Sequence, residues 1–107
     1  MKLLYVSGPM TGKPLLNFPA FNAAAEALRR AGYAVVNPVD LNPDPAAEWL
    51  ACMRNDIKAL VHCDGIALLP GWTESRGARI EAQIAEALGM TLWGVDQWLA
   101  AAARRAA

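Results

Sequence analysis

The sequence predicts an α/β protein in which helices cover both faces of a parallel β-sheet. Short apolar runs alternate with amphipathic helical stretches along its 107 residues, and glycine, proline or asparagine separates them. The run 63–69 is mostly apolar, as a central parallel strand buried on both faces requires. We therefore expect a single three-layer sandwich over residues 1–107, with four or five parallel strands joined by right-handed crossovers.

The ends of the first strand and helix are marked by turn-forming and capping residues. The apolar run 3–6 is closed by a serine, a glycine and a proline, which predicts a buried strand followed by a tight loop over 8–14. Asn17 is expected to cap the next helix, with Pro19 in its first turn. Gly32 is expected to end this helix.

A second strand is expected over 33–36. Asn37 and Pro38 follow it and predict a loop rather than a helix, because the residue before a proline is biased away from the helical region. This loop is expected to continue to a proline that directly follows Asp44. A capping side chain followed by a proline is typical of a helix start, so the second helix is expected to begin there.

The rest of the chain repeats the strand–helix pattern. After the strand over 63–69, Ser75 is expected to cap a helix that Gly89 ends. A fourth strand is expected over 91–95, and an alanine-rich helix over 96–107 closes the chain.

Charge and cysteine content exclude several function classes. Ten basic and ten acidic residues are scattered along the chain, so a nucleic-acid polymer or an anionic membrane surface is not expected as a partner. No apolar run is long enough for a membrane span or a signal peptide, and we expect a cytoplasmic protein. Cys52, His62 and Cys63 lack the spacing of a metal site. Both cysteines are expected to be small core residues.

One carboxylate interrupts the apolar face of the helix expected over 75–89. At about 100° per residue, Glu81 lies beside Gly77, Ala85 and Leu88, while the other long polar side chains point the opposite way. A buried ionised carboxylate is costly unless another group compensates it. Glu81 is therefore either a functional group or one member of an ordinary ion pair.

A ligand site is expected where the strand order reverses. In a flavodoxin-like order 2-1-3-4, this point lies between the first and third strands, beyond their carboxyl ends. The loops over 8–14 and 70–75 would border it. Asp56 shares one side of its helix with Trp49 and Met53, so it can reach the same crevice. The glycine loop over 8–14 lacks the spacing of a phosphate-binding P-loop.

Four short motifs occur in an order that is typical of one superfamily. They are Tyr5-Val6-Ser7-Gly8-Pro9-Met10, Asn17-Phe18-Pro19-Ala20-Phe21, Met53-Arg54-Asn55-Asp56 and Ser75-x-Gly77-x-x-x-Glu81. With these motifs the chain resembles the nucleoside 2-deoxyribosyltransferase-like superfamily, and within it a small bacterial and phage branch classed as a domain of unknown function. Characterised relatives cleave the N-glycosidic bond of 2′-deoxynucleosides or nucleoside monophosphates.

The resemblance implies a role for each matching residue. Glu81 would be the nucleophile that attacks the anomeric carbon, Asp56 would lie near the departing base, and Tyr5 would orient the nucleophile. Two carboxylates near one anomeric carbon also suit an oxocarbenium-like transition state. The residues expected to bind substrate are Ser7, Gly8, Pro9, Met10, Ser75 and Gly77.

The substrate pattern is mixed. Ser75 matches the monophosphate hydrolases and would contact a 5′-phosphate, whereas Gly8 and Pro9 match the transferases. Pro9 and Thr11 stand where the hydrolases carry a serine and an arginine. The resemblance also implies a homodimer or larger homo-oligomer and no metal or organic cofactor. Three tryptophans are candidates for an interface, a base-stacking wall or the core: Trp72, Trp93 and Trp98.

Three functions remain open at this stage. The first is an enzyme that cleaves or transfers the N-glycosidic bond of a (deoxy)nucleoside or nucleoside 5′-monophosphate. The second is a non-catalytic module that binds a nucleotide or related metabolite in the same crevice. The third is a structural or partner-binding domain in which Glu81 forms an ordinary ion pair.

Overall fold

A four-stranded parallel sheet forms the centre of the computed structural model, which describes residues 2–106. Its strands are β1 (Leu3–Ser7), β2 (Ala34–Val36), β3 (Gly65–Leu68) and β4 (Thr91–Gly94), and their order is β2-β1-β3-β4. All three pairings are parallel. The predicted fold class and the order 2-1-3-4 are confirmed, with four strands in the described part of the chain.

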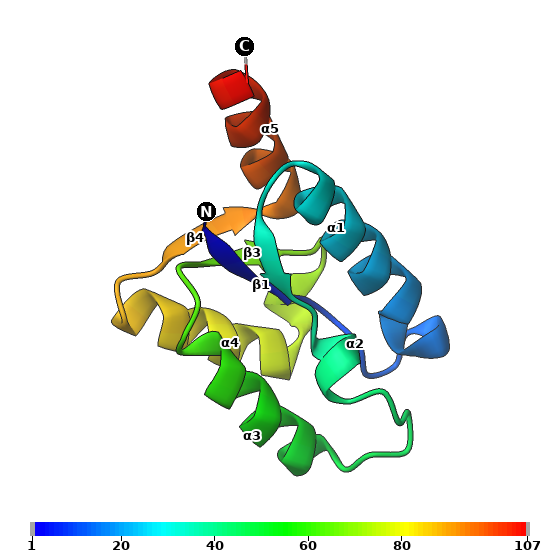
Figure 1. Cartoon of the computed structure of the whole chain (residues 1–107). Helices are drawn as coiled ribbons and strands as arrows, with labels where there is room; N and C mark the ends of the chain where they lie inside the picture. The colour runs from blue at the N-terminus through cyan, green and yellow to red at the C-terminus, as the bar shows by residue number, and fades with distance from the viewer. Residues whose placement is uncertain (1, 107) are drawn as a thin grey trace.

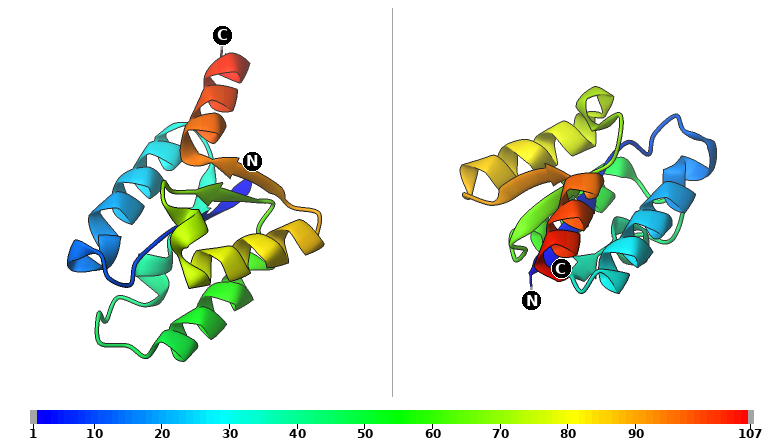
Figure 2. Two further views of the ribbon diagram at one scale, coloured as in Figure 1. Left: turned by 180° about the vertical axis from the view of Figure 1, so that it is seen from behind. Right: turned by 90° about the horizontal axis from the view of Figure 1, so that it is seen from above.

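Two pairs of long helices cover the two faces of the sheet. In Figure 1, α3 (Trp49–Leu60) and α4 (Arg76–Ala87) lie side by side below the strands, and α1 (Phe18–Arg30) lies on the other face. The last helix, α5 (Val95–Ala106), shares the α1 face and extends beyond the sheet in Figure 1 and in the left view of Figure 2. No helix within residues 2–106 combines the length and the apolar character that crossing a membrane would need.

The alternation of side chains along β1 separates an apolar set from a polar one. Leu4 and Val6 are fully buried in the cluster formed with α1 and α5. Tyr5 packs on the opposite face, under α3 and α4, and Ser7 follows it on that same face because successive strand residues alternate. The polar end of β1 therefore points at the two helices that carry Asp56 and Glu81.

The segment after β2 differs from its predicted loop. Asn37 caps a short helix, α2 (Pro38–Leu41), by accepting a hydrogen bond from the backbone of Val39. The proline fits because it lies in the first turn, where its missing N–H costs nothing. The predicted helix start at Asp44 is also wrong, because α3 begins at Trp49 and the Asp44 side chain caps only a local turn.

The predicted cap at Asn17 is wrong as well. Asn17 has a left-handed φ of 60° and makes no side-chain cap to α1. Its Nδ2 donates instead to the carbonyl of Pro9, 2.9 Å away, and so ties the loop after β1 to the helix start. Leu15 and Leu16 are left-handed too and form a short 3-10 turn, η1 (Pro14–Asn17), with Asn17. The loop therefore turns tightly before α1 begins.

Three details of the second half of the chain concern the end of α4, the turn before it and the two cysteines. Leu88 does not pack on the buried face of α4, because the helix ends at Ala87 and Leu88 is exposed. Between β3 and α4 the chain forms a 3-10 turn, η2 (Trp72–Glu74). Cys52 is partly buried and Cys63 is buried, and both are free thiols.

Candidate active site

The Glu81 carboxylate is buried and accepts two hydrogen bonds from β1. The Tyr5 hydroxyl donates to Oε2 at 2.7 Å, and the Ser7 hydroxyl donates to Oε1 at 2.7 Å. Glu81 is 4% exposed, and the two donors are completely buried. Each carboxylate oxygen thus has its own hydroxyl donor, and the side chain is held in one orientation against the central strand.

No basic side chain compensates this buried acid. The two ion pairs found within residues 2–106 join Arg29 to Asp40 and Arg30 to Glu26, on the surface and away from Glu81. The alternative in which Glu81 forms an ordinary ion pair is therefore wrong for the described chain. Hydroxyl hydrogen bonds alone stabilise the ionised form of Glu81.

Asp56 supplies a second buried carboxylate from α3. It is 8% exposed, and its Oδ1 accepts a hydrogen bond of 2.7 Å from Nδ2 of Asn42. The Tyr5 hydroxyl lies close enough to both acids to influence the pKa of each. The structure therefore brings together Glu81, Asp56, Tyr5 and Ser7 at the carboxyl end of β1.

Burial dominates the electrostatics of this group. Desolvation raises the pKa of Glu81 from 4.5 to about 7, the hydrogen bonds from Tyr5 and Ser7 oppose the rise, and the charge of Asp56 adds to it. Desolvation likewise raises the pKa of Asp56 from 3.8 to about 6, against the hydrogen bond from Asn42 and the nearby Tyr5 hydroxyl. The pKa of Tyr5 is raised well above 10 by burial and by both neighbouring acids.

The loop after β1 lies beside this group, and packing shapes it. A Cβ at Gly8 would come within 2.6 Å of the Leu69 Cβ, so only glycine allows the ends of β1 and β3 to approach this closely. Pro9 is buried and its carbonyl is bonded to Asn17. Met10 packs against the apolar cluster on the α1 face. Its partly buried side chain thus contacts the core on the other side of the sheet, away from Glu81.

The start of α4 is also shaped by local structure. The Ser75 hydroxyl accepts a hydrogen bond of 3.2 Å from the backbone of Ala78 and is the N-cap of α4, as predicted. Gly77 faces α3, where an added Cβ would lie 3.1 Å from the Met53 sulfur. Gly77 therefore allows α3 and α4 to pack closely one turn before Glu81.

Sequence reasoning missed one residue of this group, Asn42. It lies in the segment after α2 that was predicted to be an irregular loop, and no motif includes it. The signal that could have located α2 was present, since an asparagine followed by a proline is a good helix start. Nothing local indicated that the Asn42 side chain would meet Asp56, which is 14 residues away.

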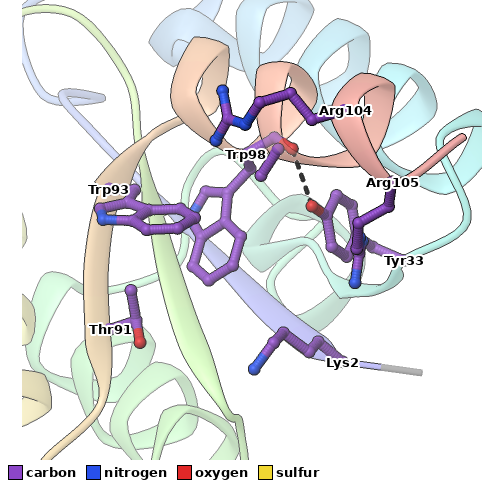
Figure 3. A pocket seen from close by; sticks show the side chains of 8 residues that line it. Lys2, Tyr33, Thr91, Trp93, Trp98, Arg104 and Arg105 are labelled. Carbon is purple, nitrogen blue, oxygen red and sulfur yellow. Dashed lines mark hydrogen bonds between the residues drawn. The ribbon is translucent and has the colours of Figure 1, made fainter. Parts of the chain in front are cut away.

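Two surface hollows lie apart from the buried acids. One has a volume of about 350 Å³ and is shown in Figure 3 between Trp93, Trp98, Tyr33 and Lys2. Two of its rings form hydrogen bonds within the chain. The Tyr33 hydroxyl donates to the Trp98 carbonyl (Figure 3), and the Trp98 indole donates to the Ile66 carbonyl. The second, of about 250 Å³, is lined in part by Trp72. The three tryptophans thus lie outside the buried group, and Trp98 is a core residue.

Comparison with known proteins gives the family. Residues 2–93 match the family described as domain of unknown function DUF4406. The chain belongs to the DUF4406 family. A search among curated proteins finds no match.

Two solved structures share the fold of this DUF4406 protein. A 2-deoxyribosyltransferase from Bacillus psychrosaccharolyticus is 18% identical with a TM-score of 0.63, over 84% of this chain and 69% of that one. A 2-desoxiribosyltransferase from Leishmania mexicana is 21% identical with a TM-score of 0.67, over 88% of this chain and 63% of that one. The DUF4406 chain therefore has the deoxyribosyltransferase fold and spans less than two thirds of the Leishmania protein.

The four buried groups of the DUF4406 chain have a defined chemical capacity. Two carboxyls with pKa values of about 6 and 7 hold one proton between them near pH 6.5, and that proton lies mostly on Glu81. One acid can then act as a nucleophile or base while the other donates a proton. Tyr5 and Ser7 supply fixed hydroxyls to the acid on α4.

Proposed function

We propose that this protein cleaves or transfers the N-glycosidic bond of a nucleoside or nucleoside 5′-monophosphate, with Glu81 as the nucleophile. The observation that carries the proposal is the buried carboxylate pair at the carboxyl end of β1, which has hydroxyl and amide donors but no paired cation among residues 2–106. Burying two acids without a counter-charge destabilises a fold, and such an arrangement is typical of a site that uses both acids. The shared deoxyribosyltransferase fold supports the same chemistry.

In the first step, an oxygen of ionised Glu81 attacks the anomeric carbon and forms a covalent glycosyl ester. The bond from that carbon to the base nitrogen breaks, and its electron pair leaves with the base. The reactive form carries the proton on Asp56, which donates it to the departing nitrogen. This is the less populated of the two singly protonated forms, because the pKa of Glu81 is the higher one. Tyr5 and Ser7 keep the two Glu81 oxygens oriented while the ester forms.

In the second step, water or the nitrogen of another base attacks the same carbon and displaces the Glu81 carboxylate. Asp56 takes the proton of this incoming nucleophile and returns to its starting form. Water gives hydrolysis and a second base gives transfer, so the proposal includes both outcomes. Retention of configuration at the sugar follows from the two displacements.

The test is release of free base from a panel of deoxynucleosides, ribonucleosides and their 5′-monophosphates, with and without a second base. Wild type is expected to release base from at least one class, and Glu81→Gln is expected to lose this activity. Glu86→Gln changes an exposed acid on the same helix and is the matched control. No release by wild type, or equal release by the Glu81 variant, contradicts the proposal. Intact ligand recovered after tight binding would instead support the non-catalytic module.

The assembly is a separate part of the proposal. The resemblance implies a homodimer or larger homo-oligomer. We propose that each chain is a single domain over residues 1–107. Sedimentation velocity of the purified chain would test this prediction. A species with the mass of one chain at the concentration of the activity assay would contradict it.

A further inference from the structure

We propose that Asn42 is a positioning residue of the candidate site, which fixes the Asp56 carboxylate beside Tyr5 and Glu81 through a hydrogen bond from its Nδ2. Asn42 follows α2, the short helix after β2, and Asp56 lies in the middle of α3. The two atoms are 2.7 Å apart, a short distance for an amide donor and a carboxylate acceptor. The catalytic use of Asp56 rests on the proposed function, but this contact does not.

The Asn42 amide can point in only one direction. Its Oδ1 accepts a hydrogen bond of 3.0 Å from Nδ2 of Asn55, and its Nδ2 also lies 3.4 Å from the Pro38 carbonyl. Rotating the amide by half a turn would place its oxygen against two other acceptors, the Asp56 carboxylate and the Pro38 carbonyl. The two acceptors and the Asn55 donor therefore together fix the orientation in which Asn42 donates to Asp56.

Asp56 depends on this donor because its other neighbours cannot replace it. The titratable groups that act on or respond to Asp56 are Tyr5 from β1, Glu81 from α4 and Cys52 one turn earlier on α3. Tyr5 has a single hydroxyl proton, and its hydrogen bond goes to Glu81. Asn42 is thus the donor committed to the buried Asp56 carboxylate.

The consequence concerns how protons divide between the two acids. A donor that stabilises ionised Asp56 sets its acidity relative to Glu81 and holds the carboxyl in a fixed place. Without Asn42, Asp56 would keep its proton to higher pH and would be free to change rotamer. The same residue would therefore control both the geometry and the protonation of the proposed acid.

The first test needs no substrate. The carboxyl-carbon NMR titrations of Asp56 and Glu81 are compared in wild type, Asn42→Ala and Gln97→Ala. Loss of a hydrogen bond to a charged group is expected to raise the Asp56 midpoint by about one pH unit in Asn42→Ala. Gln97→Ala removes an amide that bonds Gly94 at the far edge strand, and both midpoints should stay unchanged. An unchanged Asp56 midpoint in folded Asn42→Ala overturns the proposal.

A second variant covers the case in which Asn42→Ala fails to fold. Asn55→Ala changes an exposed side chain and frees the Asn42 amide without removing it. It is expected to raise the Asp56 midpoint in the same direction by a smaller amount. If the Asp56 midpoint does not move in Asn55→Ala, the orienting role assigned to Asn55 is wrong, and with an unfolded Asn42→Ala the proposal is overturned.

The activity arm separates this inference from the proposed function. On a substrate that wild type cleaves, Asn42→Ala should lower kcat about tenfold with little change in KM. It should also move the acid limb of the pH profile upward, because Asp56 has the lower pKa of the two acids. A fall in kcat with an unmoved acid limb would mean that Asn42 has only a structural role. If wild type has no activity on any substrate, the proposed function fails, while the NMR titration still decides the role of Asn42.

Discussion

Replacing Glu81 by glutamine is expected to stabilise the protein in alkaline solution. Burial raises the pKa of Glu81 to about 7 from the value of 4.5 expected in the unfolded chain. An acid with a higher pKa in the folded state contributes stability that is complete below the unfolded pKa. This stability is lost as the pH rises through the folded pKa. The loss therefore falls between about pH 4.5 and pH 7.

The difference between these two pKa values corresponds to about 3 kcal/mol of unfolding free energy. Near pH 8, Glu81→Gln should be more stable than wild type by up to about this amount, and near pH 4 the two should be similar. Urea unfolding followed by tryptophan fluorescence at several pH values measures the difference. The slope that remains in the variant belongs to Asp56 and should end near pH 6.

The matched control is Glu86→Gln, because Glu86 is exposed on the same helix. It should reproduce the wild-type dependence of stability on pH. Parallel stability curves for wild type and Glu81→Gln across this range would refute the reasoning, since they would show that Glu81 ionises as easily in the folded protein as in the unfolded one.

Three further predictions concern the surroundings of Glu81. Gly8→Ala should destabilise the protein by about 1–3 kcal/mol in urea unfolding, because its Cβ would lie 2.6 Å from the Leu69 Cβ; unchanged stability would mean that the two strand ends can separate freely. Ser75→Ala removes the N-cap of α4 and should cost about 1 kcal/mol, which a lowered urea midpoint would reveal. Tyr5→Phe removes one donor to Glu81, which has the higher pKa of the two acids, so the alkaline limb of base release should move up by about one pH unit. An unmoved limb would contradict the role of that hydrogen bond.

The fold could be predicted because each layer has a local signal. Alternating apolar strands and amphipathic helices predict a parallel sheet. The helical spacing of about 100° per residue placed Glu81 on the buried face of its helix. The same reasoning failed for α2, where Asn37 and Pro38 were interpreted as a loop signal although they are equally typical of a capped helix start. It also placed the start of α3 too early, since Asp44 caps only a turn.

The site could be predicted only in part. Glu81, Asp56 and Tyr5 could be named from their motifs, but the hydrogen bond from Ser7 to Glu81 depends on the register of β1 against α4. Asn42 could not be predicted, because its role depends on a hydrogen bond between the segment after α2 and the middle of α3. No local sequence pattern encodes how these two segments lie relative to each other. Side chains that act through a tertiary contact leave no periodic or spaced signal in the sequence.

The five residues of β1 alternate between the hydrophobic core under α1 and α5 and the face that carries Glu81 and Asp56. Inserting or deleting one amino acid within Leu3–Ser7 would exchange the two faces of the strand downstream of the change. Hydroxyl groups would then enter the packed layer beneath α1 and α5, and aliphatic side chains would meet Glu81. Inserting or deleting one residue here would therefore destabilise the fold and also remove the hydroxyl donors from Glu81. An engineered insertion or deletion in this strand should therefore change its length by an even number of residues. The loop around the exposed Leu15 has no such restriction.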